Sequence, residues 1–241
     1  MEALKALIFD VDGTLADTER DGHRIAFNLA FEQAGLKWRW DVDLYGELLA
    51  VTGGKERMVH YARLRDPAFL ARPECDTLIR KLHTLKTQHY VHLVQAGRLP
   101  LRPGVAALIR DARAAGIRLA IATTTSPENV SALLRSTLGT EAEGWFAAIG
   151  AGDIVPAKKP APDIYRWVLD RLDLPATACL AIEDSAHGLA AARGAGVATI
   201  VTENRYTRGQ DFSGALAVLP SLEKTTLADI VRIFDSGLPT A

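Results

Sequence analysis

The sequence predicts an α/β fold: a doubly wound parallel sheet interrupted by an inserted all-helical domain. Three observations support this prediction. The apolar run Ala6–Phe9 is typical of a buried strand and ends abruptly on a carboxylate. From about residue 16 to residue 95 the apolar positions follow only helical spacing. Beyond residue 103, short apolar runs alternate with amphipathic segments, which indicates parallel strands covered by helices on both faces.

The inserted segment is expected to contain three helices. Ile25 and Leu29, among other apolar pairs, recur at spacing four over about 18–34, and Gly35 ends that helix. Two further helices are expected over about 55–65 and 74–94. We therefore predict a sheet-bearing core made of residues 1–15 and 96–241, with residues 16–95 as a separate helical domain.

The second half of the chain alternates helices with strands. Ser126 is expected to cap a helix whose first turn holds Pro127. The tail 236–241 should fray. Strands are expected at 117–122, 146–149, 179–182 and 197–201, and helices at about 104–115, from 126, at 162–172, at 185–193 and at 223–234.

Composition and charge limit the classes of partner. The 241 residues include 28 Lys and Arg against 29 Asp and Glu, a net charge of -1, which argues against a broad basic surface for nucleic acid or anionic lipid. No apolar run approaches the ~20 residues of a membrane helix, and the N-terminus lacks a signal-peptide pattern. Two cysteines far apart, Cys75 and Cys179, favour a reducing compartment. We expect a cytoplasmic monomer that binds neither nucleic acid nor membrane.

Two carboxylates follow the first predicted strand. Asp10 and Asp12 stand at its carboxyl end, and Gly13 permits a sharp turn there. Ligands of open parallel sheets bind at this end of the strands. Taken alone, the pair is equally well explained as a helix-capping Asp followed by a turn Asp. Whether the pair is functional depends on which side chains the other predicted strands place at the same edge of the sheet.

Other polar side chains are expected at that edge. Each has an ordinary structural explanation by itself, such as a hydroxyl that satisfies loop backbone or a solvated lysine. Together they place three carboxylates side by side, and their repulsion predicts a hard divalent cation, Mg²⁺. An ionised Asp is a competent nucleophile toward phosphorus, while a metal, a lysine and a hydroxyl can neutralise the phosphoryl oxygens. The residues concerned are Thr123 and Thr124 after one strand, Lys158 and Lys159 before a helix, and Glu183 and Asp184 after another strand.

The order of these motifs resembles that of the haloacid dehalogenase superfamily, and the resemblance covers essentially the whole chain. The segment 16–95 is similar to the helical cap that governs substrate specificity in that superfamily. The resemblance implies a Rossmann-like core and a Mg²⁺-dependent phosphatase that works through an aspartyl-phosphate intermediate. The matching motifs are Asp10-Val11-Asp12-Gly13-Thr14, Thr123, Lys159-Pro160 and Glu183-Asp184.

The resemblance also implies a role for each core residue. Asp10 is expected to be the nucleophile and Asp12 the general acid and base. Thr123 is expected to hydrogen-bond the transferring phosphoryl group, and Lys159 to neutralise it, with Lys158 as the competing lysine.

The same comparison implies the metal ligands. Asp10, Asp184 and the Asp12 carbonyl are expected to hold Mg²⁺, with Glu183 assisting through a water molecule. Dehalogenases of the superfamily lack the second Asp and the metal, so Asp12 and Asp184 argue against that activity. Phosphonate-cleaving members use a cap lysine as a Schiff base, a role for which Lys55 is the candidate.

Further segments are similar to a narrower group, the CbbY phosphatases of Calvin-cycle organisms. This resemblance implies removal of sugar bisphosphates that inhibit Rubisco, notably xylulose-1,5-bisphosphate, so a phosphorylated sugar is the expected small-molecule partner. The segments are Asp17-Thr18-Glu19, Thr52-Gly53-Gly54-Lys55-Glu56-Arg57 and Lys159-Pro160-Ala161-Pro162-Asp163-Ile164-Tyr165.

A bisphosphate requires a second anion site away from Asp10. The predicted helix start at residues 53–55 offers backbone N–H groups and an ammonium. Lys55 is therefore the first candidate for the distal phosphate and Arg57 the second. The remaining candidates for substrate contact are Glu19, His23 and Thr124.

Two other functions fit the motifs. A phosphomutase of the same cap class would return the phosphoryl group to another hydroxyl instead of to water. A receiver-like signalling module also uses acidic residues, a Thr and a Lys. Receiver domains, however, are about half this length, carry no helical insertion and accept phosphate on an Asp at a later strand.

Overall fold

The computed structural model describes residues 3–237 and confirms the predicted α/β architecture. Six strands form one sheet in the order β3-β2-β1-β4-β5-β6, and every neighbouring pair is parallel. The order reverses direction beside β1, which is where ligands of such sheets bind. The strands are β1 Ala6–Phe9, β2 Arg118–Ala122, β3 Phe146–Gly150, β4 Cys179–Glu183, β5 Ala198–Thr202 and β6 Ala217–Leu219.

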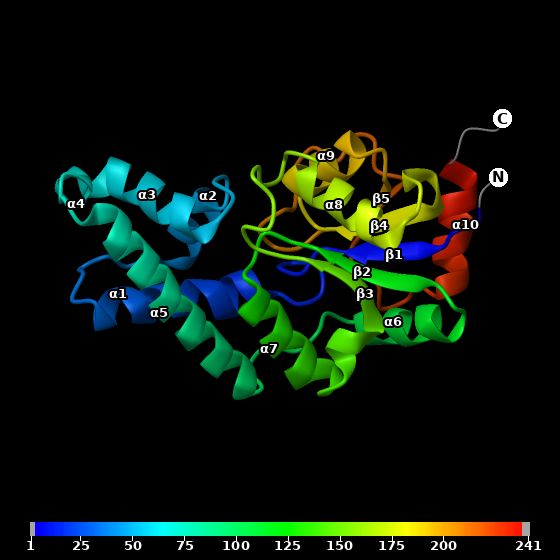
Figure 1. The fold of residues 1–241 in the computed structure, drawn as a ribbon, viewed down its shortest axis with the longest axis horizontal. Helices are drawn as coiled ribbons and strands as arrows, with labels where there is room; N and C mark the ends of the chain where they lie inside the picture. The colour runs from blue at the N-terminus through cyan, green and yellow to red at the C-terminus, as the bar shows by residue number, and fades with distance from the viewer. Residues whose placement is uncertain (1–2, 238–241) are drawn as a thin grey trace.

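Helices cover both faces of the sheet, at the right of Figure 1. Side chains alternate along a strand, so Leu7 and Phe9 face one layer while Ala6 and Ile8 face the other. Both sets are fully buried, which explains why the strands are continuous apolar runs. The first layer contains α6 Val105–Ala114, α7 Pro127–Leu138 and α10 Leu227–Gly237; the second contains α8 Asp163–Leu172 and α9 Ala186–Gly194.

The segment between β1 and α6 is helical, as expected, and lies to the left in Figure 1. It has a hydrophobic core of its own, rich in aromatic rings such as Phe31, Trp38 and Trp40. The division of the chain into two domains at residues 16 and 95 stays a prediction. The helical elements are a π-helical turn Glu19–His23, α1 Arg24–Gln33, α2 Val42–Leu48, α3 Gly54–Arg65, α4 Pro67–Leu70 and α5 Cys75–Gln95.

The two connections to this helical segment run side by side next to the first motif. Ala16 and Leu101 form an antiparallel bridge, and the Arg102 N–H donates to the Leu15 carbonyl at 2.8 Å. The chain therefore leaves the core at Ala16 and returns to it at Leu101, two neighbouring points close to Asp12 in space.

Several expectations about local structure were wrong. The sequence reading missed α2, α4 and β6, which span only 7, 4 and 3 residues and are too short for a periodic signal. The last helix begins at Leu227 rather than at 223. Ser126 is the N-cap residue of α7 and Pro127 lies in its first turn, as predicted, although the Ser126 side chain makes no capping hydrogen bond. Ser236 and Gly237 belong to α10 instead of fraying, because Phe234 anchors its last turns in the core; residues 238–241 lie outside the described part.

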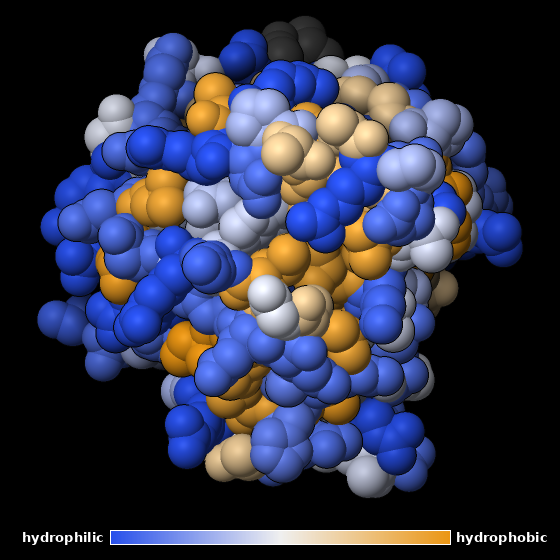
Figure 2. Space-filling model, turned by 90° about the vertical axis from the view of Figure 1, so that its left-hand side faces the viewer, coloured by the Kyte–Doolittle hydropathy of each residue, from blue (hydrophilic) through white to orange (hydrophobic). Residues whose placement is uncertain are grey.

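The surface on the side of the inserted helices is largely hydrophilic, with separate hydrophobic patches (Figure 2). Across the described residues, the exposed large hydrophobic side chains are Leu64 on α3, Ile154 in the loop after β3, and Val218 on β6. The expected monomer stays a prediction. No helix in residues 3–237 combines the length and the apolarity needed to cross a membrane.

Candidate active site

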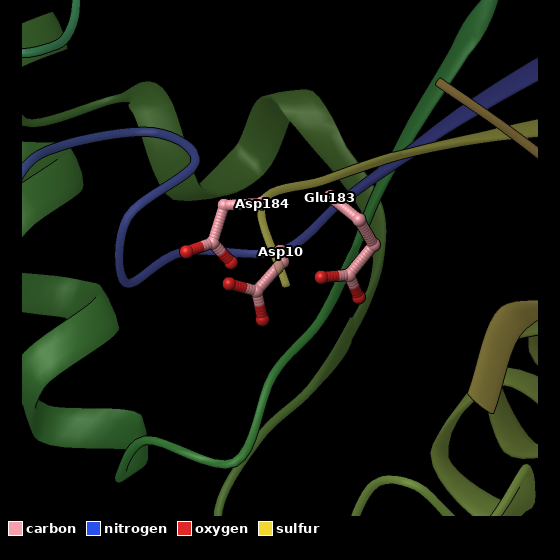
Figure 3. A group of neighbouring side chains, drawn as sticks. All are labelled: Asp10, Glu183 and Asp184. Atoms are coloured by element: carbon pink, nitrogen blue, oxygen red, sulfur yellow. The ribbon is translucent and has the colours of Figure 1, made fainter. Parts of the chain in front are cut away.

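The polar strand ends meet at one edge of the sheet. β1 lies between β2 and β4, so Asp10 stands between Thr123, which follows β2, and the pair Glu183-Asp184 at the end of β4. Figure 3 shows the carboxylates of Asp10 and Asp184 turned toward one another, with Glu183 reaching in from the same strand end as Asp184. Parallel pairing alone thus brings together residues that are more than 100 positions apart.

Lys159 is the cation at the centre of this group. Its Nζ donates to Asp10 Oδ1 at 2.7 Å, Glu183 Oε1 at 2.6 Å and the Ala122 carbonyl at 2.8 Å. Burial alone would lower the pKa of Lys159, but the charges of Asp10 and Glu183 outweigh it and raise the pKa. Lys158 pairs instead with Glu56 on α3 and with Asp153 in the loop after β3, so Lys159 is the lysine that contacts the predicted nucleophile.

The buried acidic residues carry more negative charge than one lysine balances. Burial is the main cause that raises the pKa of Asp10 from 3.8 to about 8, despite the lowering effect of Lys159. Burial also raises the pKa of Asp184 well above its usual value, and the charges of Asp10 and Glu183 add to this effect. The site therefore favours an additional bound cation.

The geometry of the acidic cluster fits Mg²⁺. One oxygen of each of Asp10, Glu183 and Asp184 lies within 4.8 Å of the others. Tyr165 donates its hydroxyl proton to Glu183 Oε1, whereas Glu183 Oε2 is buried without a hydrogen-bond partner among the described residues. A Cβ at position 188 would lie 1.9 Å from Glu183 Oε2, so Gly188 leaves room for this carboxylate. Hard oxygen donors with an unsatisfied oxygen are what a magnesium site requires.

Asp12 is held separately from the acidic cluster. Its Oδ1 accepts a hydrogen bond from Thr18 Oγ1 at 2.5 Å and lies 2.8 Å from His23 Nε2. Burial alone would raise the pKa of Asp12, but the charge of His23 and the hydrogen bonds from His23 and Thr18 lower it to about 2. The His23 ring stacks on Tyr90 with centroids 4.2 Å apart. His23 therefore orients Asp12, and its expected contact with a sugar hydroxyl stays a prediction.

These groups line a cavity of about 470 Å³ between the sheet edge and the inserted helices. Thr123 and Thr124 line it from the core, and Thr123 Oγ1 also accepts a hydrogen bond from the Thr125 N–H at 3.3 Å. Glu19 and Arg57 line it from the inserted helices. Lys55 is not part of this lining.

A second cavity of about 310 Å³ adjoins the first and is rich in basic side chains. Lys86 is buried, and its Nζ lies 5.2 Å from the ring centroids of Phe27 and Tyr90. Within residues 3–237, Lys86 has no carboxylate at ion-pair distance. Burial lowers its pKa to about 8. The basic residues that line this cavity are His23, Lys55, Arg57, His83, Lys86 and Lys158.

The two residues predicted for a distal phosphate differ in their surroundings. Lys55 Nζ lies 2.5 Å from Asp153 Oδ2, so its charge is already balanced by a core carboxylate. Arg57 is buried, donates to Tyr45 Oη at 2.9 Å, and lines both cavities. Its Nη1 lies 3.9 Å from Glu19 Oε2. Both residues thus have a carboxylate neighbour, and which of them contacts a distal phosphate stays a prediction.

Sequence reasoning missed several residues of the site. Lys86 carried a signal, because it interrupts the apolar positions Leu82 and Tyr90 on the buried face of α5. No pattern in the sequence marks Gly188, Tyr165 or Asn204, because each depends on side chains that pack against it from other elements.

Comparisons with known proteins agree with this geometry. A model of the haloacid dehalogenase-like hydrolase family matches residues 4–196. The plasmid CbbY protein of Cupriavidus necator is 54% identical over 219 residues, covering 91% of this chain and 86% of that protein. The CbbY protein of Rhodobacter capsulatus is 52% identical over 219 residues, covering 91% and 94% respectively.

Solved structures give the same relationship. The crystal structure of CbbY from Rhodobacter sphaeroides in complex with phosphate has a TM-score of 0.87 at 48% identity, covering 94% of this chain and 98% of that one. A mutant of that protein in complex with xylulose-1,5-bisphosphate also has a TM-score of 0.87, at 47% identity and with the same coverage. The chain therefore belongs to the haloacid dehalogenase-like hydrolase family and is a phosphatase with the CbbY proteins as relatives, which confirms the resemblance seen in its motifs.

Proposed function

We propose that this protein is a Mg²⁺-dependent phosphatase that hydrolyses a sugar bisphosphate, with xylulose-1,5-bisphosphate as its substrate. The observation that carries the proposal is the position of Asp10. Its carboxylate accepts a hydrogen bond from Lys159, belongs to the acidic cluster and lines the cavity of about 470 Å³. The similarity to a CbbY structure that binds xylulose-1,5-bisphosphate supports the choice of sugar.

The proposed reaction has two steps. Asp10 Oδ attacks phosphorus, and the sugar oxygen leaves with a proton from Asp12. Water then attacks the aspartyl-phosphate, with Asp12 as the base, and releases phosphate. Thr123 and Lys159 face the transferring oxygens from β2 and from the segment before α8. Asp10, Asp184, the Asp12 carbonyl and, through a water molecule, Glu183 would hold Mg²⁺, which would supply neutralisation of phosphoryl charge.

Asp12 requires a proton before the first step. Its contacts with His23 and Thr18 favour the ionised form in the free protein. A phosphate dianion placed against Asp10 adds negative charge beside Asp12, and a nearby like charge raises the pKa of a carboxyl. A bound phosphate dianion would thus shift the pKa of Asp12 upward, toward the protonated form that the first step needs, and the loss of that proton to the sugar oxygen leaves Asp12 as the base for the second step.

The second cavity supplies the proposed site for the distal phosphate. Lys86 brings an ammonium that has aromatic neighbours and no carboxylate partner within the described residues, and Arg57 borders both cavities. A phosphate would form charge-assisted hydrogen bonds with such cations, which are stronger than hydrogen bonds between neutral groups. Glu19 and Thr124, which line both cavities, are proposed to contact the sugar between its two phosphates. In this proposal, residues 16–95 form the cap that determines substrate specificity. The protein is proposed to be a cytoplasmic monomer.

A screen of phosphate release across sugar mono- and bisphosphates tests the proposal. The expected result is one equivalent of phosphate per xylulose-1,5-bisphosphate, lost with EDTA and restored by Mg²⁺. Conversion of a sugar monophosphate to its isomer without free phosphate would instead identify the mutase reaction. No turnover of any sugar phosphate in the presence of Mg²⁺ would refute the proposal. Membership in this hydrolase family removes the receiver-like alternative.

A further inference from the structure

Asp184 is oriented by a residue from a distant loop. Asn204 Nδ2 donates to Asp184 Oδ2 at 2.7 Å, and across residues 3–237 this is the one hydrogen bond that the Asp184 carboxylate accepts from a side chain. A carboxylate oxygen of Asp184 lies within 4.8 Å of carboxylate oxygens of Asp10 and Glu183 (Figure 3). Asn204 follows β5, 20 positions beyond Asp184, and belongs to none of the four motifs.

The amide of Asn204 is fixed in one orientation. Its Oδ1 accepts hydrogen bonds from the Tyr206 N–H at 2.8 Å and the Thr207 N–H at 3.3 Å. The Asn204 N–H in turn donates to Thr207 Oγ1 at 2.9 Å. A reversed amide would point its NH₂ group at two N–H donors and its oxygen at a carboxylate. The turn therefore commits the Asn204 NH₂ group to Asp184.

The turn that carries Asn204 is itself held from two sides. Arg102 donates to the Glu203 carbonyl at 2.7 Å and also to the Gly13 carbonyl. Tyr206 Oη donates to the Val42 carbonyl of the inserted segment at 3.4 Å. A Cβ at Gly13 would lie 2.6 Å from Asn204 Nδ2 and 2.3 Å from Asp184 Oδ2. Gly13 therefore packs directly against the contact between Asn204 and Asp184. Asn204 therefore has little freedom to move away from Asp184.

We infer that Asn204 is a positioning residue for the metal: it fixes the Asp184 carboxylate so that one oxygen points toward the magnesium position. The inference rests on the proposed function, which assigns Asp184 as a metal ligand. Residues that hydrogen-bond a metal ligand orient it, and their loss commonly weakens metal binding by about 10–100-fold.

Calorimetric titration of the substrate-free protein with Mg²⁺ tests this role. Asn204→Ala removes the donor to Asp184 and is expected to weaken Mg²⁺ binding by about tenfold or more. Thr207→Val is the matched control, because it removes the Thr207 Oγ1 acceptor and disturbs the same turn while leaving the Asn204 NH₂ group in place. Its Mg²⁺ affinity should stay within about twofold of wild type, although its melting temperature falls as much as that of Asn204→Ala.

Three outcomes decide the matter. Weaker Mg²⁺ binding in Asn204→Ala but not in Thr207→Val supports the positioning role, because a purely structural role would affect both variants alike. Equal Mg²⁺ affinity in wild type and Asn204→Ala, or equal losses in both variants, overturns the inference and leaves the proposed function standing. If wild type binds no Mg²⁺, the proposed function fails together with the inference.

Discussion

Lys159→Met isolates the charge balance on which the site depends. The variant keeps an unbranched side chain of similar reach but removes the ammonium that donates to Asp10, Glu183 and the Ala122 carbonyl. Two buried carboxylates then lack their cation, and removing one partner of a buried ion pair costs about 3–5 kcal/mol. A protein of this size loses about 2–4 °C in Tm for each kcal/mol, so Tm in EDTA should fall by about 6–20 °C.

The loss of Tm that Lys159→Met causes should also depend on pH. The pKa of Asp10 is about 8 in the folded protein against an ordinary value of 3.8, chiefly because of burial. A raised carboxyl pKa lowers stability as pH climbs from the unfolded value toward the folded one. Without Lys159 the pKa of Asp10 rises further, so folded Asp10 keeps its proton to higher pH. The loss of Tm relative to wild type should therefore be larger near pH 9 than near pH 6.

Thermal unfolding followed by circular dichroism, with Lys158→Met as the control, measures both effects. Lys158 pairs with Glu56 and Asp153, which are 45% and 59% exposed, so its loss should cost about 1 kcal/mol or less. Phosphate release by Lys159→Met should fall by about 10²–10³, as for loss of one oxyanion donor. Equal Tm losses for the two lysine variants, or a deficit that shrinks with rising pH, would refute this reasoning.

Three further predictions concern the remaining charged residues. Asp12→Ala should slow steady-state phosphate release by about 10² or more, and near-normal rates would exclude it as the acid and base. Lys86→Met should raise KM by about 10–100-fold for a sugar bisphosphate but not for a monophosphate. Lys55→Met should leave the KM values of both substrates nearly unchanged. Equal effects of Lys86→Met on both substrates would contradict the second anion site. Hydrogen bonding by Lys55 is the main cause that lowers the pKa of Asp153 to about 2. The stability that Asp153 contributes is thus present above about pH 4 and lost as pH falls toward 2, so Asp153→Asn should flatten the decline of Tm in this range, and an unchanged slope would count against the pairing.

The core of the site was predictable because each functional residue marks an abrupt change from apolar strand to polar side chain. Asp10, Thr123 and Asp184 follow buried strands, and parallel pairing of β1 with β2 and β4 makes them neighbours. Lys159 could be chosen over Lys158 from the motif, and its contact with Asp10 agrees with that choice.

The surroundings of the site could not be predicted in the same way. Asn204 acquires its partner only when the turn after β5 folds onto Asp184. Lys55 stands at a helix start that suits an anion, and the sequence does not show that Asp153, 98 positions further on, lies at ion-pair distance from it. Lys86 interrupts the apolar face of α5, but this pattern does not show that its ammonium borders a second cavity next to Asp12.

Chemical trapping of the intermediate tests the central claim most directly. Borohydride reduces an acyl-phosphate to an alcohol, so treatment of the enzyme during turnover of xylulose-1,5-bisphosphate with Mg²⁺ should convert Asp10 to homoserine. Peptide mass spectrometry would locate the change, and Asp10→Asn provides the matched control that should show none. Homoserine at position 10, in proportion to the enzyme trapped, is the predicted result. Full turnover with an unmodified Asp10, or with the label on another carboxylate, would contradict the account.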